Sequence, residues 1–202
     1  MDWSVLHALN DFLFRHDAVE DPLLFYVNAS EALFVATLAI VFLLAHGARY
    51  ASWRRTVVAA GLSAGAALAA GKVISDLVDR ARPFVADSHG VHLFSHHAAD
   101  PGFPSDHATA AFAIAVAIVL RKRGWGIFAL VAATVLSIGR VAIGVHYPSD
   151  VLAGAALGAA IAGLLWTAPA RKRIDALADR AGGYWDRALD WGAERVGLRR
   201  RA

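Results

Sequence analysis

The chain has 202 residues, of which 57% are hydrophobic and only 18% charged, with a mean hydropathy of +0.47 and no cysteine. A soluble domain carries about 25% charged residues, so this composition indicates one domain with membrane spans, and the lack of cysteine excludes disulfides, thiolate chemistry and cysteine-based zinc sites. The net charge of +3 reflects short loops and a basic C-terminal segment that suits anionic lipid head groups, so we expect no nucleic-acid partner.

The N-terminal segment 1–26 lacks a basic start, and charges interrupt its apolar residues, so it does not read as a cleaved signal peptide. Several apolar residues recur at the spacing of one helical face: Val5, Leu9, Phe12 and Leu13. This pattern predicts a helix lying in the membrane interface or, alternatively, part of a sixth, imperfect span.

Five apolar segments approach the length of about 20 residues that a membrane span needs. They cover residues 27–46, 56–76, 104–120, 125–143 and 149–168. The second and fifth are rich in Ala and Gly, and small residues let helices approach closely in lipid. We therefore expect these two spans to pack inside a helical bundle.

Basic clusters at 49–55, 121–123 and 171–173 fall on the same side of a five-span path. The positive-inside rule makes that side cytoplasmic, so the loop 77–103 and the turn 144–149 face outward. The predicted fold is all-α: a polytopic membrane bundle of five to six transmembrane helices, with an interfacial N-terminal helix. Residues 1–170 form the membrane domain, and the protein is expected in the inner (plasma) membrane.

The C-terminal segment 171–202 is predicted to be a cytoplasmic amphipathic tail that lies on the membrane surface. Its helical pattern covers 171–199 and places four residues on one side: Ile174, Leu177, Trp185 and Leu189. The pair Gly182-Gly183 is expected to break the helix, because glycine is a poor helix former.

Ionisable residues gather where the predicted spans meet the outward side. Such residues are costly near lipid and mark functional sites. The group comprises Lys72, Asp76, Asp79, Arg80, Arg82, Ser105, Asp106, His107, Arg140, His146 and Asp150. Several cations and two histidines on one side indicate an oxyanion site, most simply for phosphate, because a guanidinium fork and an ammonium group match phosphate oxygens.

The local sequence around the two histidines supports this interpretation. Ser105 is a good N-cap, and free N–H groups at the helix start that follows can bind an anion. His107 then lies in the first turn, where it could donate a proton to a leaving oxygen. His146 and Asp150 are four residues apart and are expected to share a helix face, so that the carboxylate fixes the tautomer of the imidazole.

These residues resemble the type 2 phosphatidic acid phosphatase superfamily, which also includes the vanadium haloperoxidases. The family motifs are Lys-x6-Arg-Pro, Pro-Ser-Gly-His and Ser-Arg-x5-His-x3-Asp. The chain has Arg82-Pro83, then Pro104-Ser105-Asp106-His107, then Gly139-Arg140-x5-His146-x3-Asp150. The resemblance covers about residues 60–168, and its strength lies in the order of the three motifs.

The chain departs from the motifs at three places. Asp106 replaces Gly in the second motif, and Gly139 replaces Ser in the third. Nine residues separate Lys72 from Arg82 instead of six, so Arg80 is an alternative first-motif cation. The Pro-Ser-Asp-His form and the stretch 144–148 are similar to the undecaprenyl pyrophosphate phosphatase branch.

The resemblance implies a mechanism in which His146 attacks phosphorus and forms a phosphohistidine. His107 protonates the leaving oxygen, and Asp150 orients His146. The phosphate oxygens are then held by Lys72, Arg82, Ser105, Asp106 and Arg140, with backbone amides near Ser105. No cofactor is implied and the sequence offers no dedicated metal cage, so we expect metal-independent activity.

The resemblance implies a lipid (pyro)phosphate as substrate, with undecaprenyl pyrophosphate, the carrier lipid of cell-wall precursors, as the leading choice and membrane lipids as the surrounding partners. Phosphatidic acid, phosphatidylglycerophosphate and other prenyl phosphates are alternative substrates, and a non-catalytic anion-binding or transport protein is the alternative class. A haloperoxidase is not expected, because those enzymes are soluble. The loop 84–102 carries four histidines and two aspartates without a recognised ligand spacing, so a solvated loop is predicted in preference to a metal site.

Overall fold

The structure, a computed structural model, describes residues 2–195, which contain helices and no strands. The helices are α1 (Asp2–Phe14), α2 (Asp17–Leu44), the 3-10 helix η1 (Ala48–Tyr50), α3 (Ala51–Val78), α4 (Pro83–Ala86), α5 (Asp106–Val119), α6 (Arg123–Ala142), α7 (Pro148–Leu165) and α8 (Ala168–Arg195). The predicted all-α class is confirmed.

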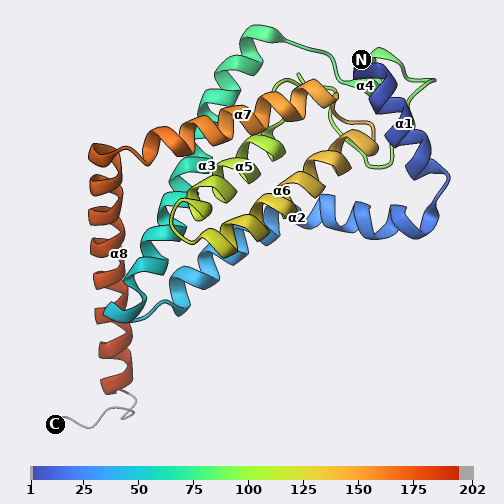
Figure 1. The fold of residues 1–202 in the computed structure, drawn as a ribbon. Coiled ribbons are helices and arrows are strands. Elements are labelled where there is room, and N and C mark those ends of the chain that lie inside the picture. Colours follow the sequence, from blue (N-terminus) through green and yellow to red (C-terminus); the bar gives the residue numbers. More distant parts are fainter. Residues whose placement is uncertain (1, 196–202) are drawn as a thin grey trace.

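Within the described residues, four helical stretches are long and apolar enough to cross a membrane: α2, the stretch Ala48–Ala86 that contains α3, α6 and α7. The third predicted span, 104–120, is the shorter apolar helix α5, which has 14 residues. It lies in the middle of the bundle and packs against α3, α6 and α7 (Figure 1). The chain is therefore a multi-pass membrane protein in which a short central helix is enclosed by longer ones.

Small residues bring α7 into close contact with α5. A Cβ atom on Gly154 would lie 2.6 Å from the carbonyl oxygen of Ser105, and one on Gly158 would lie 2.3 Å from that of Thr109. Only glycine permits this separation of the two backbones. In α3, Ala60 and Ala67 are fully buried, so each Ala/Gly-rich span packs one small-residue face against its neighbours. The expectation that these two spans lie inside the bundle is wrong, because the shorter helix α5 takes the central place and most of α3 and α7 is not buried.

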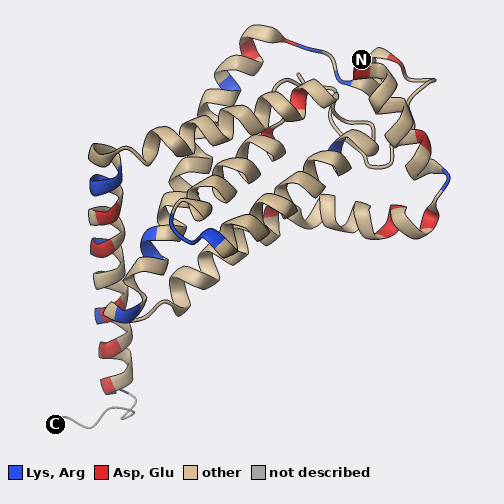
Figure 2. Cartoon of the chain, in the orientation of Figure 1, with Lys and Arg blue, Asp and Glu red and all other residues tan. Residues whose placement is uncertain are grey.

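The connections α2–α3, α5–α6 and α7–α8 lie at one end of the bundle, together with the basic clusters at 49–55, 121–123 and 171–173 (Figures 1 and 2). We call this the docking end, because α8 lies across it. Helices α1 and α4 and the α6–α7 connection lie at the opposite end, which we call the site end. The ionisable residues of the three motifs belong to the site end.

Helix α1 packs across the site end, and of the four residues predicted to share an apolar face at the membrane interface, Leu13 is buried in the protein. Val5 and Phe12 are 43% and 49% exposed, whereas Leu6, Asn10 and Leu13 are buried. The Asn10 amide donates to the carbonyl oxygens of His92 and Ala142 and accepts from the His92 amide, all at 2.8 Å. These hydrogen bonds join the buried side of α1 to the loop between α4 and α5 and to the end of α6.

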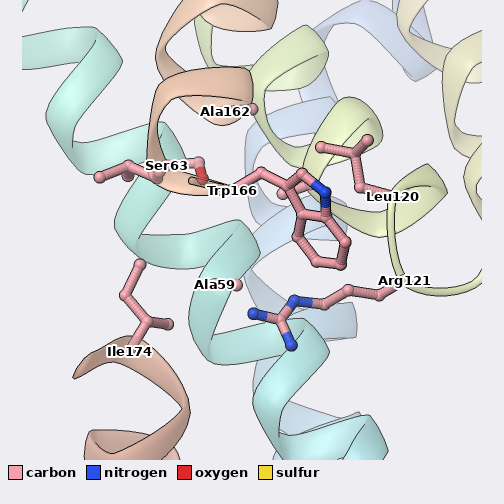
Figure 3. Close-up of a pocket in the computed structure, with 9 residues that line it drawn as sticks. Ala59, Ser63, Leu120, Arg121, Ala162, Trp166 and Ile174 are labelled. Atoms are coloured by element: carbon pink, nitrogen blue, oxygen red, sulfur yellow. The ribbon is translucent and has the colours of Figure 1, made fainter. Parts of the chain in front are cut away.

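Helix α8 is continuous from Ala168 to Arg195, so the predicted break at Gly182-Gly183 is wrong. Gly182 is instead a contact point, because a Cβ atom there would lie 2.4 Å from Nε of Arg54. Near the start of α8, a small pocket at the junction with α3 and α7 is lined by Ile174 and Trp166 together with Ala59 and Ala162 (Figure 3). Residues 196–202 of the predicted tail lie outside the described residues.

Candidate active site

A cavity of about 420 Å³ opens near the site end. Its polar part is lined by Arg82, His97, Asp100, Asp106, His107, Arg140 and His146. Its remaining walls come largely from apolar residues of α2, α3, α5 and α6, among them Phe34, Leu38, Ala64, Leu68, Ile114 and Leu136. The structure therefore brings Arg82, His107, Arg140 and His146, which are distant in the sequence, to one cavity with a charged end and an apolar extension.

His146 lies in the tight connection between α6 and α7. Helix α6 ends at Ala142, and Gly144 follows with φ of +82°, a left-handed conformation that favours glycine. A Cβ atom at Gly144 would lie 2.7 Å from Val91, so the loop between α4 and α5 packs directly over this turn. The turn places the His146 side chain at the cavity wall with only 2% exposure.

The hydrogen bonds of His146 define its tautomer. Nε2 accepts from Nη1 of Arg82 at 3.1 Å, since a guanidinium group can only donate. Nδ1 therefore carries the proton and donates to the carbonyl oxygen of Gly102 at 3.0 Å. Burial lowers the pKa of His146 well below 6.5, and the charges of Arg140 and Arg82 lower it further. The imidazole is thus neutral at physiological pH, with its lone pair on Nε2.

Arg82 is held by the chain segment that precedes α5. Its Nε donates to the carboxylate of Asp100 at 3.0 Å and to the backbone carbonyl of the same residue at 3.1 Å. Nη1 also donates to the carbonyl oxygen of Val145 at 3.2 Å. A Cβ atom on Gly102 would lie 3.0 Å from Cγ of Arg82, so this segment wraps closely around the arginine. Arg82 is 5% exposed.

Arg140 ends α6 and supplies the second guanidinium group. Its Nη2 donates to Nε2 of His97 at 2.9 Å. Its Nε is buried and has no hydrogen-bond partner among the described residues. A buried donor without a partner is costly, so this edge of Arg140 is suited to an acceptor brought by a ligand.

The start of α5 has the predicted N-cap. Ser105 is fully buried, its Oγ accepts from the Ala108 amide, and its own amide donates to the carbonyl oxygen of Asp150 at 3.1 Å. Ser105 does not line the cavity, whereas Asp106 and His107 do. The first amides of a helix have no partner within the helix, and here they belong to the residues at the cavity wall.

Asp150 lies 3.7 Å from Nδ1 of His146, which is longer than a hydrogen bond. Its carboxylate accepts from the Tyr147 amide at 2.8 Å and from Arg80 at 2.7 Å. The expectation that His146 and Asp150 share a helix face is wrong, because α7 begins at Pro148 and His146 precedes it. The hydrogen bond to Nδ1 is made by the Gly102 carbonyl instead.

Neither candidate for the first-motif cation lines the cavity. The Lys72 side chain is 74% exposed and pairs with Asp76 one turn away on α3. Arg80 donates to Asp150 and to Asp2, and it lies over the ring of Tyr147 at 4.1 Å. The contribution of Lys72 to phosphate binding stays a prediction.

Two cavity residues, His97 and Asp100, come from the loop expected to be solvated. They contact Arg140 and Arg82, respectively. Their role has no signal in residue spacing, because it depends on the loop folding back over α5. In the part of the chain that the structure describes, no three His, Asp or Glu side chains form a metal-binding group, so nothing there favours the alternative of a metal site in this loop.

These features define a class of protein: a helical membrane protein with a buried site for a phosphate-like anion beside an apolar space. The family model of the PAP2 superfamily matches residues 56–174, which include every residue of the polar end. The chain belongs to the PAP2 superfamily, and within it to the membrane phosphatases that act on lipid phosphates.

Individual relatives extend this comparison. The chain is 32% identical over 166 residues to undecaprenyl-diphosphatase BcrC of Bacillus subtilis, covering 82% of each chain. It is 35% identical over 123 residues to putative undecaprenyl-diphosphatase YbjG of Escherichia coli, covering 59% of this chain and 61% of the relative. A crystal structure of a PAP2-type phosphatidylglycerolphosphate phosphatase from B. subtilis has the same fold, with a TM-score of 0.61, 21% identity and coverage of 81% and 83%.

Proposed function

We propose that this protein hydrolyses undecaprenyl pyrophosphate to undecaprenyl phosphate and inorganic phosphate. The observation that carries the proposal is the single cavity in which two buried guanidinium groups and three imidazoles meet an apolar extension. A lipid phosphate has the same division into a charged head and an apolar tail. The similarity to BcrC over 82% of both chains supports a prenyl pyrophosphate as the substrate.

The chemistry proceeds in two displacements. Nε2 of His146 forms a bond to the terminal phosphorus as the bond to the bridging oxygen breaks, and His107 protonates that leaving oxygen. Water then attacks the phosphohistidine and gives a proton to His107, which restores it, while the N–P bond breaks and inorganic phosphate leaves. Arg82, Arg140 and the first amides of α5 stabilise the charge on the non-bridging oxygens, so the proposal needs no metal.

The same geometry requires one rearrangement. Nε2 of His146 accepts a hydrogen bond from Arg82 in the empty site, and a lone pair engaged in this way cannot attack phosphorus. Arg82 therefore transfers that donor to a phosphate oxygen when the substrate enters. The Gly102 carbonyl keeps its bond to Nδ1 and maintains the tautomer that attack needs.

We propose that the site end faces the extracytoplasmic side of the plasma membrane. The basic clusters gather at the opposite, docking end, as the positive-inside rule requires of a cytoplasmic side. In this arrangement residues 1–170 are the phosphatase domain, and α8 belongs to a cytoplasmic tail.

A substrate panel tests the function. Purified protein in detergent is offered undecaprenyl pyrophosphate, farnesyl phosphate, phosphatidic acid and phosphatidylglycerophosphate, with and without excess chelator, and phosphate release is measured. We expect the highest kcat/KM for undecaprenyl pyrophosphate and no loss with chelator. Preference for a diacyl phosphate would replace the proposed substrate, and phosphate binding without turnover of any lipid would favour an anion-binding or transport protein. Chelator-induced loss restored by Mg²⁺ would refute the metal-free mechanism.

A further inference from the structure

Both arginines of the cavity are held by one short segment of the loop between α4 and α5. Asp100 accepts from Nε of Arg82 at 3.0 Å, and His97 accepts from Nη2 of Arg140 at 2.9 Å. Nδ1 of His97 lies 3.8 Å from the Asp100 carboxylate, so the two side chains are neighbours over the cavity. Neither residue belongs to the three motifs.

The contact between Asp100 and Arg82 has the chemistry of a phosphate contact. A carboxylate oxygen and a phosphate oxygen both accept from a guanidinium N–H with nearly the same geometry. Burial would raise the pKa of Asp100, but the hydrogen bond and the charge of Arg82 outweigh this and keep it below 3.8, so the group is an anion at neutral pH. In the structure, Arg82 thus already has one anion, the Asp100 carboxylate, as its partner.

The position of Asp100 makes this anion replaceable. The Asp100 side chain is 57% exposed, whereas that of Arg82 is 6% exposed, so the carboxylate sits at the mouth and the guanidinium inside. An exposed carboxylate loses little when it returns to water, because ion pairs with an exposed partner contribute little stability. A bound phosphate can therefore displace it.

His97 makes a weaker contact of the same kind. Burial lowers the pKa of His97 and the charges of Arg82 and Arg140 lower it further, so the ring is neutral. Its Nδ1 donates to the Ala98 carbonyl at 3.3 Å, and Nε2 is left to accept from Arg140. A neutral acceptor does not repel a phosphate as strongly as a carboxylate does, so Asp100 is the principal competitor.

Building on the proposed function, we infer that Asp100 is a positioning residue that imitates the substrate. In the empty site it occupies the edge of Arg82 that takes a phosphate oxygen in the complex, and it thereby holds Arg82 against Nε2 of His146. Substrate phosphate replaces the Asp100 carboxylate, draws Arg82 away from the imidazole and leaves the Nε2 lone pair free. The nucleophile is thus masked until an anion arrives.

Equilibrium binding of inorganic phosphate to the purified full chain tests this inference. Asp100→Asn removes the competing charge, so phosphate should bind about two- to fivefold more tightly, the range set by a partly exposed ion pair. With undecaprenyl pyrophosphate as substrate, KM should fall by a similar factor while kcat stays within about twofold. Asp21→Asn is the matched control, since it removes the same charge from an exposed position that does not line the cavity, and it should leave both values unchanged.

Weaker or unchanged phosphate binding in Asp100→Asn would overturn the inference, because Asp100 would then support Arg82 without competing for its ligand. Failure of the wild-type chain to bind phosphate would overturn it as well. Asp100→Ser, judged folded by its Tm in detergent, gives the same test if the amide variant does not fold. Because binding needs no turnover, a wild-type chain that binds phosphate but hydrolyses no lipid would refute the proposed function and still decide the role of Asp100.

Discussion

The two ends of the bundle use arginine in opposite ways. At the docking end, Arg54, Arg55 and Arg121 pair with Asp186, Asp179 and Asp175 of α8, each at 2.7 or 2.8 Å. At the site end, Arg82 and Arg140 share one cavity. Among the described residues, Arg82 pairs with the carboxylate of the exposed Asp100, and Arg140 contacts the neutral ring of His97.

This difference separates structural from anion-binding arginines. Asp175, Asp179 and Asp186 recur along α8, so each of these three guanidinium groups meets a fixed charge of opposite sign. Figure 2 shows the acidic residues spread along α8 beside the basic ends of the neighbouring helices.

In the cavity, Arg82 and Arg140 are buried, and the carboxylate that pairs with Arg82 belongs to the exposed Asp100. A buried Nε without a hydrogen-bond partner among the described residues occurs at both ends, on Arg140 and on Arg54 and Arg121, so it does not distinguish them. Buried cations are tolerated when a partner compensates them, and in the proposed mechanism the substrate phosphate becomes that partner at the site end.

The largest test concerns the nucleophile. His146→Asn should lower kcat for lipid phosphate hydrolysis by at least about 10³-fold, because loss of a nucleophile removes the covalent route. Steady-state phosphate release measures this effect. His89→Asn is the control, since His89 is exposed on the same side and does not line the cavity. Activity of the His146 variant within tenfold of wild type would contradict the mechanism.

The next test compares the loss of one arginine from each end of the bundle. Arg140→Ala should lower kcat/KM by about 10²- to 10³-fold and leave Tm nearly unchanged, because Arg140 stabilises transition-state charge. Arg54→Ala should retain activity within about threefold but lower Tm by roughly 2–8 °C, because Asp186 loses its partner. Kinetics and thermal unfolding in detergent separate the two outcomes, and a variant with the opposite pattern would remove the distinction between the ends.

A smaller effect is expected for the cation outside the cavity. Lys72 is exposed and paired with Asp76, so Lys72→Ala should lower kcat/KM by less than about tenfold. The assay is phosphate release from the preferred lipid, with Asp76→Ala measured in parallel. A loss of about 10²-fold in the lysine variant alone would place Lys72 on the phosphate in the complex.

The smallest effect is on stability as a function of pH. The pKa of His146 is below 6.5 in the folded chain, so below pH 6.5 the unfolded chain binds more protons and stability falls as pH falls. Tm should therefore decrease between pH 7 and pH 5, with this residue contributing at most about 1.4 kcal/mol per pH unit. His146→Gln should flatten that decrease; an equally steep decrease in the variant would show that the imidazole is not held neutral.

Much of the bundle follows from the sequence, because apolar length and turn residues act locally. The predicted spans 125–143 and 149–168 correspond to α6 and α7 within a few residues at each end. Helix α2 instead begins ten residues before the predicted start at 27, since the acidic residues of its first turn are favourable at a helix N-terminus and do not interrupt it. The glycine pair in α8 is tolerated because α3 packs against it.

Within the site, only the residues that belong to the three motifs could be predicted from the sequence. Arg82, His107, Arg140 and His146 follow from the three motifs, and the structure places all four at one cavity. The partner of Nδ1 is a backbone carbonyl, that of Gly102, which has no side-chain signature in a sequence. His97 and Asp100 reach the arginines only because the loop folds back, and no local pattern encodes such a path.

The central helix α5 is shorter than the membrane that the bundle crosses. Fourteen residues rise about 21 Å, whereas the hydrocarbon core is about 30 Å thick. Helix α5 alone is therefore about 9 Å too short for a full crossing, and the longer helices α2, α3, α6 and α7 around it supply the remaining length. The cavity beside the first turn of α5 is accordingly walled on its apolar side by three of these longer helices, α2, α3 and α6, together with α5 itself.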